Sequence, residues 1–452
     1  MTQLVPEKTE ANRTVSQGSG QWSEVGSRKS DITGQITQSS VVGHRSSVIG
    51  HPTHSVALLT GGGDKPYALG MAAALTSVGM HVDFIGSDDL NVPKLLNDPL
   101  VNFLNLRGDQ RPEASRMAKV IRVLNYYARL VRYAATSKPK IFHILWNNKF
   151  ELCDRTLLML YYKFLGKKIV LTAHNVNIRR RDSNDTLMNR FTLRVQYLLC
   201  DQIFVHTKGM KTELVTDFGV PEDEVSVIPF GINNTVPKTT LTTLEAKRRL
   251  GIIGSDKAIL FFGNIAPYKG LEFLITAFIE VANQDRSYRL IIVGKPKQSE
   301  NYWNEIRRNI AHSGLRDRII ERIEYIPDEE TELYFKAADV LVLPYTHIFQ
   351  SGVLFLGYSF GLPAIAADVG SLKEEIIEGK TGFVFKRQDS FDLAKLITNY
   401  FESELFRNLE SRRPEIKKYA NDQYSWDKVG RITTTVYSNL LNSDLPATPK
   451  LS

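Results

Sequence analysis

Short apolar runs alternate with longer amphipathic stretches from residue 55 onward, and the alternation occurs in two successive series. The first series has such runs at residues 56–59, 81–85, 141–145, 168–172 and 202–206, and the second has them at residues 258–262, 289–294, 323–326, 340–343 and 364–366. The runs are rich in Ile, Leu and Val, which indicates strands buried on both faces of a parallel sheet. Strands that alternate with helices predict βαβ units. We therefore expect an α/β protein with two doubly wound parallel-sheet domains.

The length of 452 residues also favours two domains, because a single core rarely grows so large. A Gly-, Pro- and Thr-containing stretch at residues 230–243 interrupts the periodicity and marks the boundary. The predicted parts are a disordered tail at residues 1–54, a first domain at 55–235, a second domain at 236–412, C-terminal helices at 413–442 and a frayed end at 443–452. The tail is assigned from its Ser, Thr and Gly content and its lack of apolar runs.

Charge and composition narrow the range of partners. The chain carries 57 Lys and Arg against 49 Asp and Glu, a formal charge of +8, which favours anionic partners. Signatures of nucleic-acid-binding motifs are absent from the sequence, so we expect no nucleic-acid partner. No apolar run approaches the roughly 20 residues of a membrane-spanning helix. Cys153 and Cys200 lie in apolar surroundings and are predicted to be buried thiols in a reducing cytoplasm.

The stretch at residues 261–270 runs from an apolar strand into a Gly/Pro-rich loop with one lysine, Lys269, and then opens a helix. Such a corner directs backbone N–H groups, the positive helix end and the ammonium to one spot, which suits a phosphate. A leaving nucleoside diphosphate needs a fixed cation when no metal supplies it. The plainer interpretation of Lys269 is a solvated loop lysine.

Further glycine-containing loops follow other predicted strands, where open α/β sheets bind their ligands. Free N–H groups at the helix start near Gly352 can hold the same diphosphate from the other side. Gly61–Gly63 allows a close phosphate approach or simply makes a tight turn, and Lys65-Pro66 breaks the spacing of a dinucleotide fingerprint. The residues predicted to bind a nucleoside diphosphate sugar, the donor of a sugar transfer, are Gly62, Gly63, Gly263, Asn264, Gly294, Lys295, Ser351, Gly352 and Val353.

His174 directly follows the apolar run at residues 169–173, so we expect it at a strand tip that faces a cleft between the two domains. An imidazole there can hydrogen-bond a sugar hydroxyl or help to neutralise developing charge. A structural histidine is the alternative, since His143 and His206 also lie in predicted strands.

No metal site is expected. The acidic pair Asp88-Asp89 lacks the partner ligands that Mg²⁺ or Mn²⁺ requires. Nucleophile elbows, Walker loops and HExxH motifs are absent from the sequence, so we predict neither a metal nor another cofactor.

Residues 116–135 are predicted to form a basic, amphipathic helix. Its basic side has Lys119, Arg122, Arg129 and Arg132, and its apolar side has Ile121, Leu124, Ala128 and Val131. One interpretation is an ordinary helix of a doubly wound domain with a solvated basic face. The other is a helix that rests on an anionic membrane and brings an enzyme to a lipid-linked acceptor. Arg179 and Arg180 add positive charge near the expected cleft and are predicted to bind the acceptor.

From residue 55 to about 441 the chain resembles the retaining glycosyltransferases of family 4, which have the GT-B fold of two Rossmann-like domains facing across a cleft. The segments that carry this resemblance are Gly61–Gly63, Thr172–His174, Val227–Asn233, Ala337–Val340 with Leu343-Pro344, and Gly361–Ala366. The helix after Trp426 resembles the one that crosses back to the first domain in that family.

The resemblance implies a retaining hexosyltransferase that moves a sugar from a nucleoside diphosphate sugar to a glycan or lipid-linked acceptor without a metal. His174 and Lys269 take the catalytic positions, and the first domain contacts the acceptor. It further implies a role in polysaccharide biosynthesis at the cytoplasmic face of a membrane.

Two departures from the family pattern keep another interpretation open. Asn264 stands where the family usually has arginine, and Ile348 and Leu356 stand where it tends to have two glutamates, the second of which commonly grips the ribose. The alternative is a catalytically inactive GT-B scaffold or sugar-nucleotide-binding protein. A dinucleotide-dependent oxidoreductase is disfavoured by the missing fingerprint.

Overall fold

The computed structural model describes residues 55–442 except 112–114, 149, 178, 180–184, 233, 235, 298 and the side chain of Lys94. The predicted tail at residues 1–54 and the predicted frayed end at residues 443–452 lie outside the described residues.

The first described sheet is entirely parallel, with seven strands in the order β3-β2-β1-β4-β5-β6-β7. Its strands are β1 (Ser55–Leu59), β2 (His81–Gly86), β3 (Val101–Asn105), β4 (Ile141–Ile144), β5 (Lys168–Thr172), β6 (Gln202–Val205) and β7 (Val225–Val227). The five predicted strands are confirmed. The two edge strands, β3 and β7, were not predicted, because both are short and only partly buried and so lack an apolar run.

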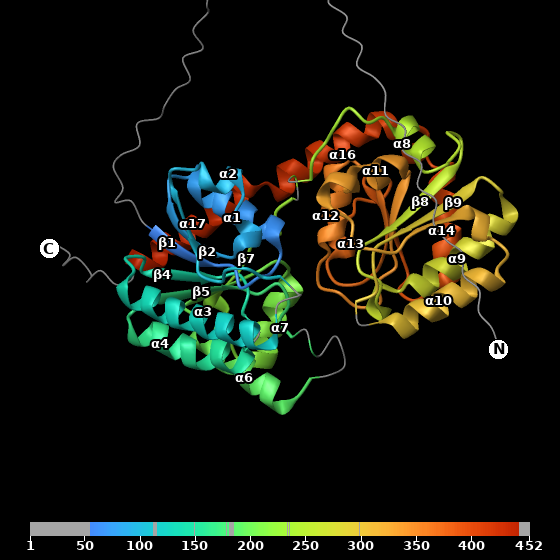
Figure 1. The fold of residues 1–452 in the computed structure, drawn as a ribbon. Coiled ribbons are helices and arrows are strands. Elements are labelled where there is room, and N and C mark those ends of the chain that lie inside the picture. Colours follow the sequence, from blue (N-terminus) through green and yellow to red (C-terminus); the bar gives the residue numbers. More distant parts are fainter. Residues whose placement is uncertain are drawn as a thin grey trace, which may run out of the picture. The chain divides into compact units, whose positions relative to one another are not determined.

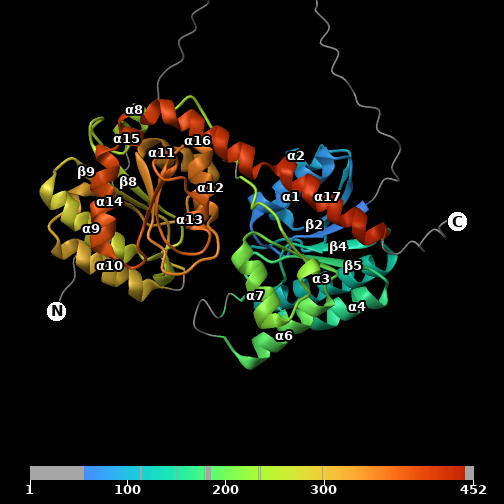
Figure 2. The same ribbon diagram turned by 180° about the vertical axis from the view of Figure 1, so that it is seen from behind.

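Helices cover both faces of this sheet, as a doubly wound domain requires (Figures 1 and 2). They are α1 (Lys65–Ser77), α2 (Pro93–Leu96), α3 (Arg116–Thr136), α4 (Leu158–Phe164), α6 (Leu187–Leu199) and α7 (Lys208–Phe218). Two short 3₁₀ turns, η1 (Asp88–Leu90) and η3 (Glu222–Glu224), and a π-helical segment, η2 (Cys153–Leu157), complete the described part of the domain. In both views α3, α4 and α6 form one layer, and α1 lies on the opposite face. Of the two free cysteine thiols, that of Cys200 is buried as expected, whereas Cys153 is only half-buried.

The second described sheet is also parallel, with six strands in the order β10-β9-β8-β11-β12-β13. They are β8 (Lys257–Phe262), β9 (Tyr288–Val293), β10 (Ile319–Arg322), β11 (Val340–Leu343), β12 (Ala364–Ala367) and β13 (Gly382–Phe385). The strand predicted at residues 323–326 is wrong, since the ladder pairs the preceding segment, which includes Glu321 and Arg322. This strand lies at the sheet edge, where polar side chains are tolerated.

The helices of the second domain pack on both sides of its sheet (Figures 1 and 2). They are α8 (Thr243–Arg249), α9 (Leu271–Gln284), α10 (Glu300–His312), α11 (Asp328–Ala337), α12 (Gly352–Ser359), α13 (Leu372–Glu375), α14 (Ser390–Glu402), α15 (Glu404–Arg407) and α16 (Leu409–Tyr424), with turns η4 (Pro267–Lys269) and η5 (Arg316–Arg318). The two sheets and their helices confirm the predicted fold class.

The C-terminal helices divide between the two cores. Ile416 and Ala420 of α16 belong to the core of the second domain, whereas Val429 and Tyr437 of α17 (Trp426–Asn442) belong to the core around α1. Trp426 fixes the turn between the two helices: its Nε1 donates to the Ile232 carbonyl at 3.1 Å. The change of domain therefore falls at Ser425.

A buried histidine attaches α17 to the first sheet. His143 Nδ1 lies 2.5 Å from the Tyr437 hydroxyl, and its Nε2 lies 2.7 Å from the Thr172 hydroxyl. Burial lowers the pKa of His143 to about 3. The imidazole is therefore neutral at physiological pH and bridges α17 to β5.

A buried ion pair ties α8 to the second sheet. Lys247 Nζ donates to Asp339 Oδ2 at 2.8 Å and to the Asp256 carbonyl at 2.8 Å, and both charged side chains are buried. Asp339 Oδ2 also accepts the Ala258 N–H at 2.8 Å. Burial raises the pKa of Asp339, and Lys247 opposes that rise.

We predict that Lys247→Met lowers the free energy of unfolding by about 3–5 kcal/mol, because it leaves the Asp339 carboxylate buried without its counter-charge. Lys257→Met is the matched control, since the Lys257–Asp285 pair is partly exposed and contributes at most about 1 kcal/mol. Urea denaturation followed by circular dichroism measures both. Equal losses in the two variants would contradict this account of the pair.

Candidate active site

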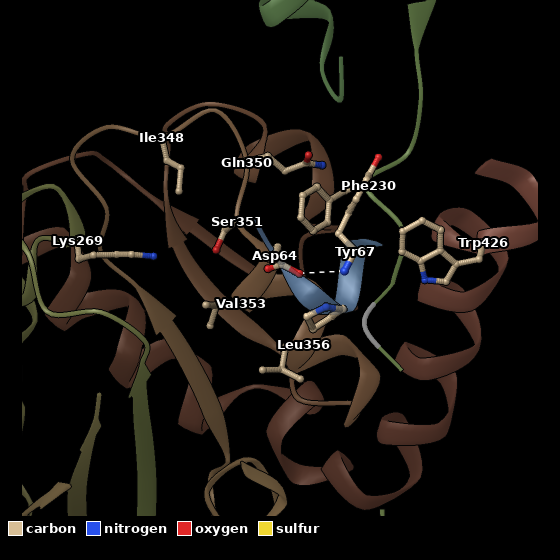
Figure 3. Close-up of a pocket in the computed structure, with 13 residues that line it drawn as sticks. Asp64, Tyr67, Phe230, Lys269, Ile348, Gln350, Ser351, Val353, Leu356 and Trp426 are labelled. Atoms are coloured by element: carbon tan, nitrogen blue, oxygen red, sulfur yellow. Dashed lines mark hydrogen bonds between the residues drawn. The ribbon is translucent and has the colours of Figure 1, made fainter. Parts of the chain in front are cut away.

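A cavity of about 290 Å³ collects side chains from loops and helix starts of both sheets. Its lining comprises Asp64, Pro66, Tyr67, Phe230, Gly231, Lys269, Ile348, Gln350, Ser351, Gly352, Val353, Leu356 and Trp426 (Figure 3). Of the predicted site residues, the cavity brings together Lys269, Ser351, Gly352 and Val353.

Lys269 is held with its ammonium at the cavity. The residue is only 6% exposed, and its Nζ lies 3.9 Å from the centroid of the Tyr345 ring. Gly270 follows with φ of +63°, and a Cβ there would come within 1.9 Å of the Pro344 carbonyl oxygen, so this corner requires glycine. The side chain points toward Ser351 and Asp64 in Figure 3. Lys269 is thus a fixed cation rather than a solvated loop lysine.

The N-terminus of α12 faces the same cavity. Ser351 is its N-cap residue, is buried, and lies with its Oγ 3.3 Å from the Tyr345 hydroxyl. N–H groups in the first turn of a helix have no carbonyl partner one turn earlier and carry the positive end of the helix dipole. Lys269 and the α12 N-terminus therefore form one electropositive corner suited to a phosphate.

The predicted loop residues 263, 264, 294 and 295 are absent from the described lining of this cavity. A Cβ on Gly294 would lie 1.8 Å from the Gly263 carbonyl oxygen, and Gly263 N–H donates to Val293 at 2.9 Å. These two glycines let the loops after β8 and β9 pack against each other. The structure thus gives them a packing reason that does not depend on a ligand.

Gly62 and Gly63 likewise pack closely and lie beside the cavity rather than in its described lining. A Cβ on Gly63 would come within 1.9 Å of the Trp146 ring. The next residue, Asp64, does line the cavity and caps α1, where its Oδ1 accepts the Tyr67 N–H at 2.9 Å (Figure 3). Burial raises the pKa of the Asp64 carboxyl.

His174 follows β5, as expected, but it lies behind the wall of the cavity. Its ring stacks on Trp146 with centroids 4.1 Å apart and meets the edge of Tyr67 at 4.5 Å. Tyr67 lines the cavity, whereas His174 is not among the described residues that do. One aromatic ring therefore separates His174 from the Lys269 corner.

Hydrogen bonds determine which nitrogen of His174 carries its proton. His206 Nδ1 lies 3.3 Å from the Ile228 carbonyl, which only accepts, so this nitrogen is protonated. Burial lowers the pKa of His206 to about 4, and the neutral ring offers Nε2 as an acceptor to His174 Nδ1 at 3.1 Å. His174 Nε2 is then left as a buried acceptor without a described partner. A hydroxyl donor is the group that suits it.

The two positions that depart from the family's glutamates both face the cavity. Ile348 and Leu356 are part of its lining and present apolar side chains there (Figure 3). Neither can accept a hydrogen bond from a ribose hydroxyl.

Arg179 lines a different cavity, of about 530 Å³, and its Nη2 donates to Glu151 Oε2 at 2.7 Å. This salt bridge neutralises part of the charge assigned to acceptor binding. Arg180 lies outside the described residues. Among the residues that are described, no group of three or more His, Cys, Asp or Glu side chains could hold a metal ion.

Sequence reasoning missed several aromatic and polar residues of the cavity. Tyr67 sits in the first turn of α1, Phe230 follows β7, Gln350 precedes α12, and Trp426 opens α17. Phe230 packs against both Tyr67 and Phe355, with centroids 5.3 and 5.8 Å away. Phe230 belongs to the segment Val227–Asn233 that carries part of the family resemblance, but its contacts come from distant segments and have no local signal in the sequence.

Comparisons with known proteins agree with this architecture. The sequence model of the family "Glycosyltransferase Family 4" matches residues 61–235, and the sequence model of the family "Glycosyl transferases group 1" matches residues 256–403. The D-inositol 3-phosphate glycosyltransferase of Corynebacterium aurimucosum is 23% identical over 290 residues, which are 62% of this chain and 68% of that relative.

Two solved structures are similar in fold. Sucrose-phosphate synthase from Thermosynechococcus elongatus matches with a TM-score of 0.66 at 18% identity, covering 86% of this chain and 100% of its own. HepE from Anabaena in complex with UDP matches with a TM-score of 0.64 at 16% identity, covering 85% of this chain and 100% of its own.

The two family models together with the fold identify a glycosyltransferase of the GT-B class. The two family models cover separate domains and together span most of the sequence. Residues 61–235 are similar to glycosyltransferase family 4, and residues 256–403 to the group 1 glycosyltransferases.

The buried histidines predict acid sensitivity. An unfolded histidine titrates near pH 6.5, whereas the folded state keeps His206 neutral down to about pH 4, so the unfolded chain binds more protons in between. The stability that His206 contributes is complete above about pH 6.5 and is lost as the pH falls toward 4.

We expect the free energy of unfolding to fall between pH 7 and pH 5 by on the order of 1–2 kcal/mol more in the wild type than in His206→Gln. Denaturant titrations at the two pH values measure this. His312→Gln, at an exposed histidine of α10, serves as the control and should follow the wild type. A His206→Gln variant with the full wild-type pH dependence would refute the assignment.

Proposed function

We propose that this protein is a retaining, metal-independent glycosyltransferase that takes a hexosyl group from a nucleoside diphosphate sugar. The observation that carries the proposal is the meeting of a fixed cation, Lys269, with the N-terminus of α12 in one cavity. A diphosphate leaving group develops negative charge as the sugar departs, and preorganised donors stabilise that charge. Here the protein itself supplies those donors.

In this proposal each part of the site has one role. Lys269 and the N–H groups near Gly352 hold the leaving diphosphate. His174 Nε2 accepts a hydrogen bond from a sugar hydroxyl and so orients the sugar. Because Tyr67 lies against His174 and lines the cavity, its ring has to move for the sugar to reach that nitrogen.

The proteins to which this chain is similar support a nucleotide-sugar donor. HepE structures contain UDP in one case and UDP-glucose in another. The relative from Corynebacterium aurimucosum is named as a glycosyltransferase of D-inositol 3-phosphate. For this chain we propose the same class of donor, with a glycan or lipid-linked acceptor bound by the first domain in polysaccharide or glycolipid assembly.

The apolar lining at Ile348 and Leu356 favours a second candidate, a scaffold that binds sugar nucleotides without turning them over. Without a glutamate to accept hydrogen bonds from the ribose hydroxyls, nucleoside binding is weaker, but the corner formed by Lys269 and the α12 N-terminus stays intact. Nucleotide binding with no transfer or hydrolysis of the donor would point to this candidate.

The exposed face of α3 supports the membrane interpretation of the basic helix. α3 buries Tyr126, Leu130 and Ala134 against the sheet. The apolar stripe of residues 117, 121, 124, 128 and 131 lies on its exposed side, where Met117 is 68% and Leu124 64% exposed. An ordinary packed helix would bury its apolar stripe, so α3 has a second apolar face available for a partner.

Neighbouring helices extend this apolar surface. Further exposed apolar side chains lie on the segment leading into η2 and α4 and on α6: Phe150, Leu152, Leu157, Leu160, Phe164, Leu187, Met188, Phe191 and Leu198. Together with the arginines of α3 they match an anionic bilayer, which takes apolar side chains and attracts cations. We propose peripheral, cytoplasmic membrane contact through this surface. Among the described residues, no helix combines the length and apolar character needed to cross a bilayer.

Lys269→Met tests the donor site. Losing a charge-assisted contact worth about 1.5–3 kcal/mol should weaken binding of the preferred nucleoside diphosphate by roughly 10- to 100-fold. A thermal-shift panel of UDP, GDP, ADP and their sugar conjugates identifies the base, and calorimetry then gives the affinity. Lys297→Ala, an exposed lysine outside the described cavity lining, is the control. Undiminished affinity in folded Lys269→Met would refute the donor site.

Leu124→Gln tests the membrane surface. Each inserted leucine contributes about 1.5–3 kcal/mol, so cosedimentation with phosphatidylglycerol-containing vesicles should weaken about tenfold or more. Leu244→Gln is matched, because Leu244 is 68% exposed but lies on α8 of the other domain. Equal binding by both variants, or no vesicle binding by the wild type, would exclude this surface.

A further inference from the structure

A second, separate pocket of about 80 Å³ lies at the carboxyl edge of the first sheet. Its described lining is Arg107, Gln110, Arg122, Val123, Tyr126, Tyr127, Asn148 and Phe150. The volume exceeds the roughly 10–15 Å³ that one water needs. Arg107 follows β3, and Asn148 follows β4, so the pocket occupies the edge where parallel sheets bind ligands.

Arg107 is held in place by packing, and none of the described acidic side chains pairs with it. Its guanidinium lies against the backbone of Gly62, where a Cβ would come within 2.1 Å of Nη1. On another side its Cζ lies 5.9 Å from the centroid of the Tyr126 ring. Nη1 is buried and makes no hydrogen bond in the described structure. A buried guanidinium nitrogen without an acceptor is costly, and an anionic ligand would satisfy it.

The rest of the pocket also suits an anion. Arg122 adds a second guanidinium, whose Nη1 donates to the Asp109 carbonyl. No acidic side chain occurs in the pocket's described lining. The nearby Asp154, which is outside this lining, accepts the Tyr127 hydroxyl at 2.8 Å and the Asn148 amide at 3.3 Å, both through Oδ1. Its Oδ2 is buried without a described partner, and burial raises the pKa of this carboxyl.

We propose that Arg107 and Arg122 bind a phosphate group carried by the acceptor. This inference rests on the proposed transferase function, and it gives the acceptor a chemical class: a phosphorylated molecule, either soluble or a lipid headgroup. Two guanidinium groups match phosphate oxygens in charge and geometry.

The position of the pocket favours the acceptor over the donor. It shares no described lining residue with the Lys269 cavity. The two cavities are nevertheless close to each other. Arg107 of this pocket contacts Gly62, and Asp64, two residues further along the chain, lines the Lys269 cavity. Arg122 and Tyr126 lie on α3, the helix with the exposed apolar stripe, so a lipid headgroup at that surface could reach the pocket.

Calorimetric titration of the UDP-saturated protein with sn-glycerol 3-phosphate, and with glycerol as the uncharged control, tests the site. We expect the phosphate ester to bind and glycerol not to bind. Arg107→Gln should weaken binding of the ester at least tenfold, and Arg122→Gln provides a second variant if the first fails to fold. Arg248→Gln, at an exposed arginine on α8 of the other domain, removes the same charge elsewhere and should leave the affinity unchanged.

UDP affinity, measured separately on each variant, distinguishes failure of this site from failure of the proposed function. Unchanged UDP binding with lost ester binding supports the acceptor site. If a variant weakens UDP binding as much as ester binding, Arg107 belongs to the donor site, and the proposed acceptor site is overturned. No ester binding by the wild type, whether or not UDP binds, would also overturn it. Vesicles containing phosphatidic acid, compared with phosphatidylcholine alone, show whether a lipid phosphate is captured through Arg107 as well.

Discussion

The contact between the loops after β8 and β11 is the constraint on which the candidate site depends. Gly270 approaches the Pro344 carbonyl so closely that no side chain fits, and Thr346 N–H donates to the Tyr268 carbonyl at 2.9 Å. Because these loops are fixed together, Lys269 lies over Tyr345, and Tyr345 in turn reaches Ser351. The cation and the helix N-terminus are thereby placed at one cavity before any ligand arrives, which is the preorganisation that charge stabilisation requires.

The same arrangement explains how the protein can tolerate its departures from the family pattern. The diphosphate corner uses an ammonium and backbone N–H groups, neither of which depends on the lost glutamates. Ile348 and Leu356 change the part of the cavity where a nucleoside's hydroxyls would need acceptors. Affinity for the nucleoside and stabilisation of the leaving group are thus separable properties of this site.

Local sequence patterns predicted the features that have local causes. The two strand series, the helix at residues 116–135 and the Lys269 and Gly352 corners follow from apolar runs, glycines and helix starts close to them in the chain. Tyr67 and Trp426 were not predicted to line the cavity, because these two distant residues meet only in the folded chain, with ring centroids 5.2 Å apart. The tautomer of His174 depends on His206 and Ile228, and the choice of which face α3 buries depends on the sheet beneath it. Neither can be obtained from periodicity alone.

Amide hydrogen exchange with and without a nucleoside diphosphate tests the central claim most directly. Saturating UDP, or whichever diphosphate binds, should slow exchange at residues 263–270 and 351–354, while the matching monophosphate should protect these segments far less. Protection confined to other segments, or equal protection by the monophosphate, would contradict a diphosphate site built from Lys269 and the start of α12.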